Sequence, residues 1–254
     1  MTLRRIFLKQ LRKKLNERSI DLQRKGSKAQ HLCINKFKEE LGVTLAINDY
    51  DGTADFIINR TNNYKIAEKF EKKGIRVFNP SSLSKLANNK QLCYEFMEKN
   101  GIEILPINYK EVPAVKKPID GHGGQGVVMI NEKESFESGF VYQKPCATLG
   151  KDLRVWAIGN DIITSILRES DTDFRSNFCL GGRATPYKIN EEEKSLVKRI
   201  LSLVESDYIG IDFLFDGGHL IFNEIEDTVG ARMVYDKTDI DIIKLYCDYI
   251  KKNI

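Results

Sequence analysis

Short apolar segments alternate with amphipathic ones along the first hundred residues of the chain. Residues 55–59 (DFIIN) and 75–78 are apolar runs next to turn residues, which predicts two short buried strands. Residues 64–73 carry apolar positions at helical spacing, and residues 84–99 predict a second helix. A strand, helix, strand order favours a partly parallel sheet, so this part of the chain predicts an α/β lobe.

From residue 140 the pattern becomes mostly β. Segments 140–143, 153–158 and 162–167 predict strands, because β-branched and aromatic residues dominate each of them. A charged helix is expected at 191–204 and a closing helix at 239–251. The chain as a whole therefore predicts an α/β (α+β) protein, without an internal repeat or a low-complexity linker.

The segment 208–226, YIGIDFLFDGGHLIFNEIE, predicts a hairpin of two antiparallel strands with three acidic residues inside apolar arms. Side chains alternate between the two faces of a strand, so Glu224 and Glu226 are expected on one face, together with Phe222. Asp212 lies in the opposite arm. Carboxylates in such strands suit a cation, although a solvated face of an edge hairpin remains the alternative.

The register of the hairpin decides whether Asp212 joins the other two carboxylates. If Phe215 pairs with His219 across a three-residue loop, Asp212 lies diagonal to Glu224 on the same face. A two-residue loop would place it on the opposite face. Three adjacent carboxylates repel one another unless a divalent ion neutralises them, and oxygen ligands suit Mg²⁺ or Mn²⁺.

The segment 115–130, VKKPIDGHGGQGVVMI, places a glycine-rich loop between two strand-like arms. Glycines at this density let backbone N–H groups approach phosphate oxygens, and Lys116 or Lys117 supplies positive charge. His122 lies within the loop. No Lys-Ser/Thr pair follows the glycines and no helix begins after them, which excludes a P-loop and disfavours a dinucleotide fingerprint. We expect a lid over a triphosphate, with an ordinary hairpin connection as the alternative.

Composition is compatible with a cytoplasmic enzyme. The chain has 254 residues, of which 41% are hydrophobic, enough for more than one lobe. No apolar run reaches the roughly 18 residues that span a membrane, so we expect a soluble protein without membrane partners. The five cysteines never show CxxC spacing, which argues against a zinc site or a disulfide framework.

The N-terminal segment 4–38 is rich in basic residues and predicts an amphipathic helix. Its apolar stripe is expected to pack on the body of the protein. The rival interpretation is a docking surface for an acidic partner or nucleic acid, although no aromatic stacking platform supports the latter. The stripe consists of Ile6, Phe7, Leu8, Leu11 and Leu15.

Five strings of the sequence, KPIDGHGGQGV, GKDLRVWAIG, DFRSNFCLGG, GIDFLF and FNEIEDTVG, resemble the ATP-grasp superfamily in order and spacing. Within it, the chain is similar to the RimK-type ligases, which join an amino acid to a carboxylate. The resemblance implies an ATP-grasp fold with a shortened N-terminal α/β lobe over 1–87. The ATP-grasp domain would span 88–254, with a lid subdomain at 88–143 and a metal and substrate subdomain at 144–254.

The resemblance also implies which residues hold the nucleotide. It assigns two lysines to the phosphates, glycines to the lid loop, three consecutive residues to the hinge that reads adenine, and two residues to the cleft. These residues are Lys90, Lys117, Gly121, His122, Gly123, Gly124, Gln143, Lys144, Pro145, Asp152 and Arg154.

Catalytic and metal-binding positions are implied in the same way. Positions near the γ-phosphate and the acceptor correspond to Arg168, Arg175 and Asn177, and the ligands of Mg²⁺ or Mn²⁺, two ions in all, correspond to Asp212, Glu224 and Glu226. One departure concerns Glu226, where the RimK-type ligases usually have Asn. The added charge should strengthen metal binding. The usual Ser-Pro-Gly that follows is here replaced by residues 227–230, DTVG.

The expected function is ATP-dependent ligation of a carboxylate and an amine through an acylphosphate, with release of ADP and phosphate. A carboxylate attacking a phosphate brings two anions together, so catalysis depends on positioning and neutralisation. Arg168 and Arg175 would stabilise the oxyanion of the amine step. The expected partners are ATP, an acid and an amino acid or other amine, with self-association left open. The alternative is an ATP-binding interaction protein that has lost ligation and docks partners through its basic N-terminal helix.

Overall fold

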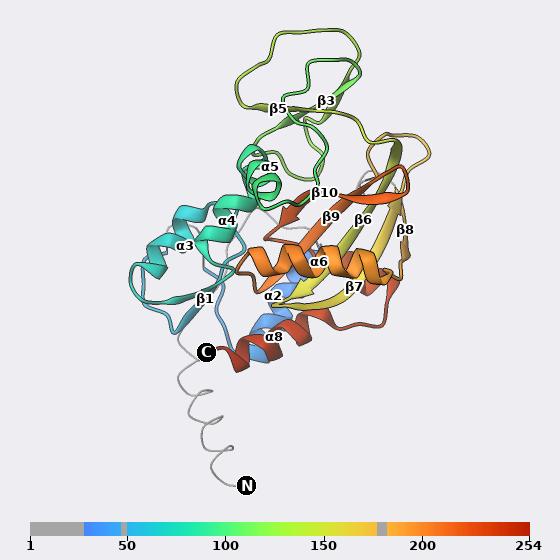
Figure 1. Cartoon of the computed structure of the whole chain (residues 1–254). Coiled ribbons are helices and arrows are strands. Elements are labelled where there is room, and N and C mark those ends of the chain that lie inside the picture. Colours follow the sequence, from blue (N-terminus) through green and yellow to red (C-terminus); the bar gives the residue numbers. More distant parts are fainter. Residues whose placement is uncertain (1–27, 47–49, 177–181) are drawn as a thin grey trace, which may run out of the picture.

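The computed structural model describes residues 28–46, 50–176 and 182–254, with backbone only for 28–32. Strands in these residues form three sheets, and helices cover the largest of them (Figure 1). The apolar stripe predicted for the N-terminal basic helix lies outside the described residues. In the described part of the chain, no helix is both long and apolar enough to cross a bilayer.

A small parallel sheet forms the N-terminal lobe. Strand β1 (Phe56–Ile58) pairs in parallel with β2 (Arg76–Phe78), and helix α3 (Tyr64–Glu71) connects them. This confirms the predicted strand, helix, strand unit. Helix α2 (Lys28–Leu41) packs against the C-terminal helix α8 (Ile242–Lys252) on another side of the molecule.

The single helix predicted for residues 84–99 is wrong, because the structure has two helices there. Helix α4 (Ser81–Ala87) ends before α5 (Lys90–Lys99) begins. The side chain of Asn89 accepts a hydrogen bond of 2.9 Å from the backbone N–H of Leu92 and so caps α5. Asparagine at this position satisfies a helix terminus better than it continues a helix. The break places Lys90 in the first turn of α5.

The central sheet has five antiparallel strands in the order β10-β9-β6-β7-β8. Sequence patterns predicted four of them and missed the short edge strand β8. The strands are β6 (Thr148–Ile158), β7 (Asp161–Glu169), β8 (Arg183–Pro186), β9 (Tyr208–Asp216) and β10 (His219–Glu226).

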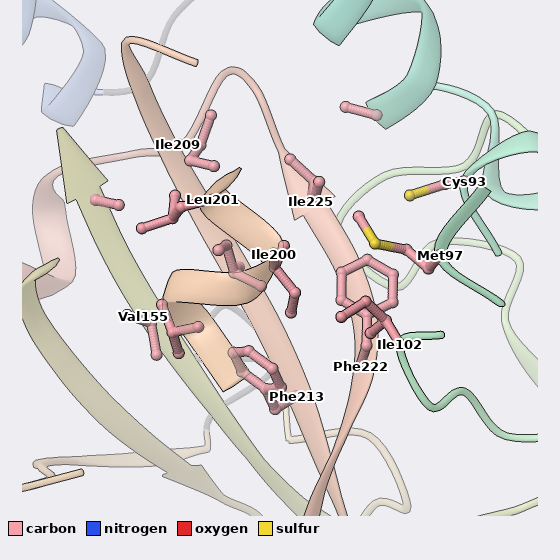
Figure 2. Close-up of a cluster of buried hydrophobic side chains, with 14 of the residues drawn as sticks. Cys93, Met97, Ile102, Val155, Ile200, Leu201, Ile209, Phe213, Phe222 and Ile225 are labelled. Atoms are coloured by element: carbon pink, nitrogen blue, oxygen red, sulfur yellow. The ribbon is translucent and has the colours of Figure 1, made fainter. Parts of the chain in front are cut away.

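Apolar side chains cover both faces of this sheet. On one face Phe213 and Phe222 pack against α6 (Glu191–Leu203) and α5 (Figure 2). On the other face Trp156 and Tyr208 pack with α2 and α8, near α7 (Arg232–Lys237). A capping box at Asn190 starts α6 close to the predicted residue. Each face of the central sheet thus packs in a separate apolar cluster. The strands, packed on both faces, hold the polar side chains that they carry in fixed positions.

The predicted hairpin forms, and of the two registers left open by the sequence it adopts the one with the two-residue loop. His219 pairs with Asp216, so the loop is the two-residue Gly217-Gly218, and both glycines have positive φ. Such a loop is the commonest connection of a hairpin because its twist matches the strands. By simple alternation this register would separate Asp212 from Glu224.

A β-bulge nevertheless places Asp212 and Glu224 on the same face of the hairpin. The register shifts between Phe222 and Glu224, so that Phe222 pairs with Phe213 while Glu224 lies directly opposite Asp212. The expectation that Phe222 shares a face with Glu224 is therefore wrong: Phe222 is fully buried in the apolar cluster shared with α5 and α6. Asn223 is the extra residue that sends the carboxylate to the face of Asp212.

The third sheet, of order β4-β3-β5, stands above the central sheet in Figure 1. Strand β3 (Ala114–Pro118) leads through the glycine-rich loop to β4 (Val128–Ile130), and β5 (Phe140–Gln143) returns to the central sheet. The predicted strand, loop, strand arrangement is confirmed. Gln143, at the end of β5, forms an antiparallel bridge with Ile107.

Candidate active site

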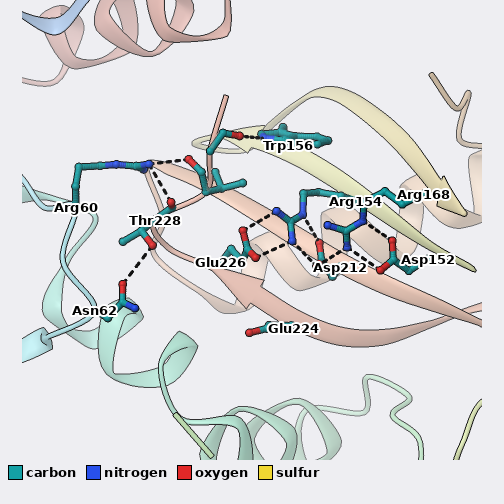
Figure 3. Close-up of polar contacts among 12 residues, drawn as sticks. Arg60, Asn62, Asp152, Arg154, Trp156, Arg168, Asp212, Glu224, Glu226 and Thr228 are labelled. Atoms are coloured by element: carbon teal, nitrogen blue, oxygen red, sulfur yellow. Dashed lines mark hydrogen bonds and ion pairs between the residues drawn. The ribbon is translucent and has the colours of Figure 1, made fainter. Parts of the chain in front are cut away.

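Two arginines and three carboxylates form a buried network on the central sheet (Figure 3). Strand pairing places Arg154 of β6 opposite Asp212 of β9. The guanidinium of Arg154 donates two hydrogen bonds of 2.6 Å to Asp212 and two of 2.7 Å to Glu226. Such fork-to-fork pairing fixes both partners in position. Asp212 and Glu226 are thus brought together by one guanidinium.

Arg168 extends the network to the next strand. It lies opposite Asp152 and donates to both of its oxygens at 2.5 and 2.8 Å, while a third bond of 2.8 Å reaches Asp212. Burial opposes ionisation of Asp212, but Arg154 and Arg168 outweigh it and lower its pKa. Burial raises the pKa of Glu226, which shares only Arg154. Asp212 is therefore the carboxylate that carries a fixed negative charge.

Lys90 connects the acidic hairpin to the glycine-rich loop. Its Nζ donates to Glu224 Oε1 at 2.9 Å and to the carbonyl oxygen of Gly121 at 2.5 Å. The lysine is buried because it begins α5, directly after the Asn89 cap. Three segments far apart in sequence meet at this ammonium group.

Among the described residues, the ammonium group of Lys117 donates only to neutral side-chain oxygens. Its Nζ donates to Gln143 Oε1 at 2.6 Å, to Asn223 Oδ1 at 2.9 Å and to the hydroxyl of Tyr94 at 3.2 Å. Burial, aided by Lys90, lowers its pKa to about 8. Sequence reasoning missed Tyr94 and Asn223. A polar residue inside the apolar run LIFNEIE is the one signal that marks Asn223.

The glycine-rich loop contacts residues 173–175 (DFR), which belong to one of the five strings that resemble the ATP-grasp superfamily. Arg175 pairs with Asp173 at 2.7 Å and donates to the carbonyl oxygens of Gly124, at 3.0 Å, and Val127, at 3.4 Å. Gly123, Gly124 and Gly126 have positive φ, which other residues rarely adopt. His122 lies half-buried in the same loop. Asn177, the remaining predicted catalytic residue, lies outside the described residues.

The predicted hinge follows β5 without interruption. Lys144 donates its backbone N–H to the carbonyl oxygen of Pro106 at 2.9 Å, and its side chain is exposed. Gln143 also donates to the carbonyl of Leu105 at 3.2 Å. Gln143, Lys144 and the half-buried Pro145 therefore join the sheet of β3, β4 and β5 to the central sheet at a point fixed by residues 105–106.

Comparison with known protein families identifies the family to which this chain belongs. A model described as the RimK-like ATP-grasp domain matches residues 82–250. The chain belongs to this family.

Two relatives of this RimK-like protein are named as glutamate ligases. A probable alpha-L-glutamate ligase of Maridesulfovibrio salexigens is 27% identical over 74% of the chain and 71% of its own length. The Glutamate--LysW ligase ArgX of Sulfurisphaera tokodaii is 24% identical over 89% of the chain and 91% of its length. The protein is an ATP-grasp, ADP-forming ligase that makes amide or peptide bonds. The resemblance inferred from the five strings is thereby confirmed.

Solved structures confirm the ATP-grasp fold. The ATP-grasp ligase PsnB, in complex with a phosphomimetic variant of its minimal precursor, Mg and ADP, has a TM-score of 0.69 at 15% identity and covers 94% of the chain and 100% of its own. That related ligase binds ADP and Mg.

Two of the three carboxylates assigned to a metal in this RimK-like ligase, Asp212 and Glu226, are paired with Arg154. Asp212, Glu224 and Glu226 lie on one face and provide hard oxygen donors, which fits Mg²⁺ or Mn²⁺. Arg154 holds both oxygens of Asp212 and of Glu226, however. No group of His, Cys, Asp and Glu side chains in the described ranges is arranged to hold a metal as it stands. The donor set fits a divalent ion provided that Arg154 yields oxygen atoms to it.

The DTVG loop after β10 is held by the N-terminal lobe and by β6 of the central sheet (Figure 3). Arg60 donates to the carbonyl oxygens of Thr228 at 2.9 Å and Val229 at 2.8 Å. Asn79 donates to the carbonyl of Asp227 at 2.7 Å, and Trp156 to that of Gly230 at 3.1 Å. No sequence pattern predicted these contacts, because they join residues from opposite ends of the chain.

Proposed function

We propose that this ligase phosphorylates a substrate carboxylate with ATP and transfers the activated acyl group to the amine of an amino acid. The observation that carries the proposal is the position of Lys90, within hydrogen-bonding distance of both the glycine-rich loop and Glu224. A phosphate cradle and an acidic metal-type hairpin thus converge on one cation. Phosphoryl transfer requires this combination, because it depends on positioning and on neutralising charge.

The nucleotide would lie under the glycine-rich loop. Lys90 and Lys117 would neutralise its phosphates, and the chain at 143–145 would contact the adenine. Lys117 suits an anion because its present partners are neutral and its burial disfavours an uncompensated charge. The lid loop, which contains Gly121, His122, Gly123 and Gly124, would exclude water from the acylphosphate.

The acidic hairpin would serve the reacting phosphate. Asp212, Glu224 and Glu226 are the residues that would hold Mg²⁺, two ions in the full proposal. Bound Mg²⁺ supplies positive charge to the transferring phosphoryl group. Asp152 holds Arg168 in place, and Arg154 orients Asp212 and Glu226.

The amine step needs cations at a second position. Arg168 and Arg175 would stabilise the oxyanion that forms when the amine attacks, with Asn177 beside them. No nucleophilic side chain is needed, since the acylphosphate is itself the activated species. For the amino acid we propose glutamate, because the two relatives described above are named glutamate ligases. The acid would be the carboxylate of a peptide or of another amino acid.

Product analysis tests this function. The protein is incubated with ATP, Mg²⁺, L-glutamate and glutamate-ending peptides, and products are followed by chromatography and mass spectrometry. We expect ADP and phosphate in proportion to a peptide that has gained one glutamate residue. AMP as the stoichiometric product would refute the acylphosphate route.

A matched pair of variants separates the site from general damage. Lys117→Ala should abolish turnover. Lys116→Ala removes the neighbouring lysine of the same strand, which pairs with Glu134 and Glu137, and should leave turnover close to wild type. Equal loss in both variants would count against Lys117 as a phosphate ligand.

A further inference from the structure

Most basic side chains of the candidate site are already paired with carboxylates. Lys90 contacts Glu224, Arg154 contacts Asp212 and Glu226, Arg168 contacts Asp152 and Asp212, and Arg175 contacts Asp173. In each of these pairs a carboxylate already compensates part of the cation's charge. A site that brings together ATP and two organic substrates nevertheless needs cations for several anions.

Two basic side chains around this network form no ion pair within the described ranges. Lys117 donates to neutral oxygens only. Arg60 donates to the backbone carbonyls of Thr228 and Val229, and its guanidinium lies 5.9 Å from the ring centre of Tyr208. Lys117 lies at the lid and has been assigned to a phosphate above. Arg60 lies at the N-terminal lobe, so it marks a second anion position.

Arg60 borders the Arg154 network through the backbone that it holds. Val229 packs on Gly210, where an added Cβ would come within 2.7 Å of Val229 Cγ2 and 3.5 Å of the Cδ of Arg154. Arg60 thus contacts the backbone of a residue whose side chain packs close to the stem of Arg154. The position is next to the strand end that carries Glu226, because the residues Arg60 contacts follow it directly in sequence.

A buried polar atom lies in the same place. The hydroxyl of Tyr208 is fully buried and has no hydrogen-bond partner in the described part of the chain. Both Arg60 and Arg154 act on it electrostatically. Buried hydroxyls are normally satisfied, so this one leaves an unmet hydrogen-bonding group on the ring that Arg60 approaches.

We propose that Arg60 determines substrate specificity by binding the carboxylate that the amino-acid substrate retains during ligation. This inference rests on the proposed function. The reacting carboxylate of the acid becomes an acylphosphate, whose negative charge lies on the phosphoryl group and departs with phosphate. The amino acid reacts through its amine and keeps its α-carboxylate throughout. A lasting anion suits Arg60, because its guanidinium is permanently charged.

The hydrogen bonds of Arg60 leave room for this role. Both backbone contacts come from one terminal nitrogen. A guanidinium has five N–H donors in a fork that matches a carboxylate. The same side chain thus holds the DTVG loop and presents further donors, which explains how the loop could differ from Ser-Pro-Gly and still border a substrate.

The test compares two amines that differ only at the α-carboxylate. ADP release is measured with L-glutamyl-L-glutamate as the acid and with either L-glutamate or its α-amide as the amine. Wild type should show a KM for glutamate about tenfold to hundredfold lower than for the α-amide, the effect of losing a charge-assisted contact. Arg60→Gln should raise the glutamate KM to that of the α-amide while leaving the KM for ATP unchanged.

Two further variants exclude a merely structural effect. Arg60→Lys keeps the charge without the fork and should retain part of the preference for glutamate. Lys65→Gln removes an exposed charge from the same lobe and should behave as wild type. An equal rise of KM for both amines in Arg60→Gln would show that Arg60 only shapes the loop and would overturn the inference.

The outcomes distinguish this inference from the proposed function. If wild type ligates glutamate and its α-amide equally well, the function stands and the role of Arg60 is refuted. If no amine supports ADP release, the proposed function is refuted and the inference with it. Should Arg60→Gln fail to fold, the role of Arg60 is still tested by two measurements. These are the preference of wild type for L-glutamate over its α-amide and the same preference in Arg60→Lys.

Discussion

Replacing Arg154 with methionine tests the charge balance of the site most directly. Methionine keeps an unbranched stem beside Trp156 but removes the guanidinium of a residue that is only 8% exposed. Four hydrogen bonds of 2.6 to 2.7 Å to Asp212 and Glu226 are lost together. The buried Asp212 and the half-buried Glu226 then face each other with less compensation.

The size of the effect follows from the remaining contacts. Removing one partner of a buried ion pair costs about 3–5 kcal/mol, because the other charge stays buried. Arg168 still donates to Asp212 at 2.8 Å, and Glu226 takes up a proton readily because burial raises its pKa. We therefore expect Arg154→Met to lower the free energy of unfolding by about 3 kcal/mol, the lower end of this range.

Magnesium should reverse much of this loss. Oxygen atoms freed from Arg154 bind a divalent ion without competition, and a ligand at a hundred times its Kd stabilises a folded protein by about 2.7 kcal/mol. Wild type should gain less from Mg²⁺, because the ion has to displace Arg154.

Urea unfolding measures both effects. Trp156 is the single tryptophan, is buried, and lies beside Arg154, so its fluorescence reports on this region. Arg183→Met is the matched control, since it breaks an exposed pair with Asp171 and should cost at most about 1 kcal/mol. Equal losses in the two variants, or equal Mg²⁺ gains in Arg154→Met and wild type, would refute the reasoning.

Three further predictions concern single side chains. Lys117→Ala should weaken ATP binding about tenfold to hundredfold in calorimetry, because a charged contact to phosphate is lost; unchanged affinity would exclude the phosphate assignment. Glu226→Gln should raise the half-saturating Mg²⁺ concentration for activity about tenfold, and identical titrations would remove Glu226 from the metal site. Burial raises the pKa of Asp207 to about 6 against the opposing effect of Arg76, so the folded state binds this proton more tightly and stability falls as pH rises from about 4 to 6. Asp207→Asn should therefore gain up to about 3 kcal/mol relative to wild type between pH 4 and pH 7 in urea unfolding, and a pH-independent difference would contradict the raised pKa.

Local patterns predicted much of the fold because they depend on neighbouring residues. The acidic hairpin, the glycine-rich loop between β3 and β4 and the antiparallel strands all follow from side-chain alternation and from residues that permit positive φ. The predicted helix was wrong at a position where two local structures compete. At Asn88 and Asn89 a helix can continue or be capped again, and capping prevails because the side chain of Asn89 satisfies the N–H of Leu92.

The bulge at Asn223 shows what alternation cannot supply. Its side chain accepts hydrogen bonds from Lys117 and Tyr94, which belong to the lid sheet and to α5. Those contacts become available only once three separate elements have packed together. The sequence predicted that Asp212 and Glu224 would share a face, yet by a register that the structure does not adopt.

The sequence by itself determined the ATP-grasp family, the strands and loops, and the residue types able to bind phosphate and metal. The tertiary structure alone decided the pairing of these residues, above all of Arg60 with Thr228, which lie 168 positions apart. Secondary structure depends on the torsions and spacing of adjacent residues, which the sequence records directly. Charge pairing depends on which distant side chains packing brings within about 3 Å, where hydrogen bonds form, and only the folded chain sets that distance.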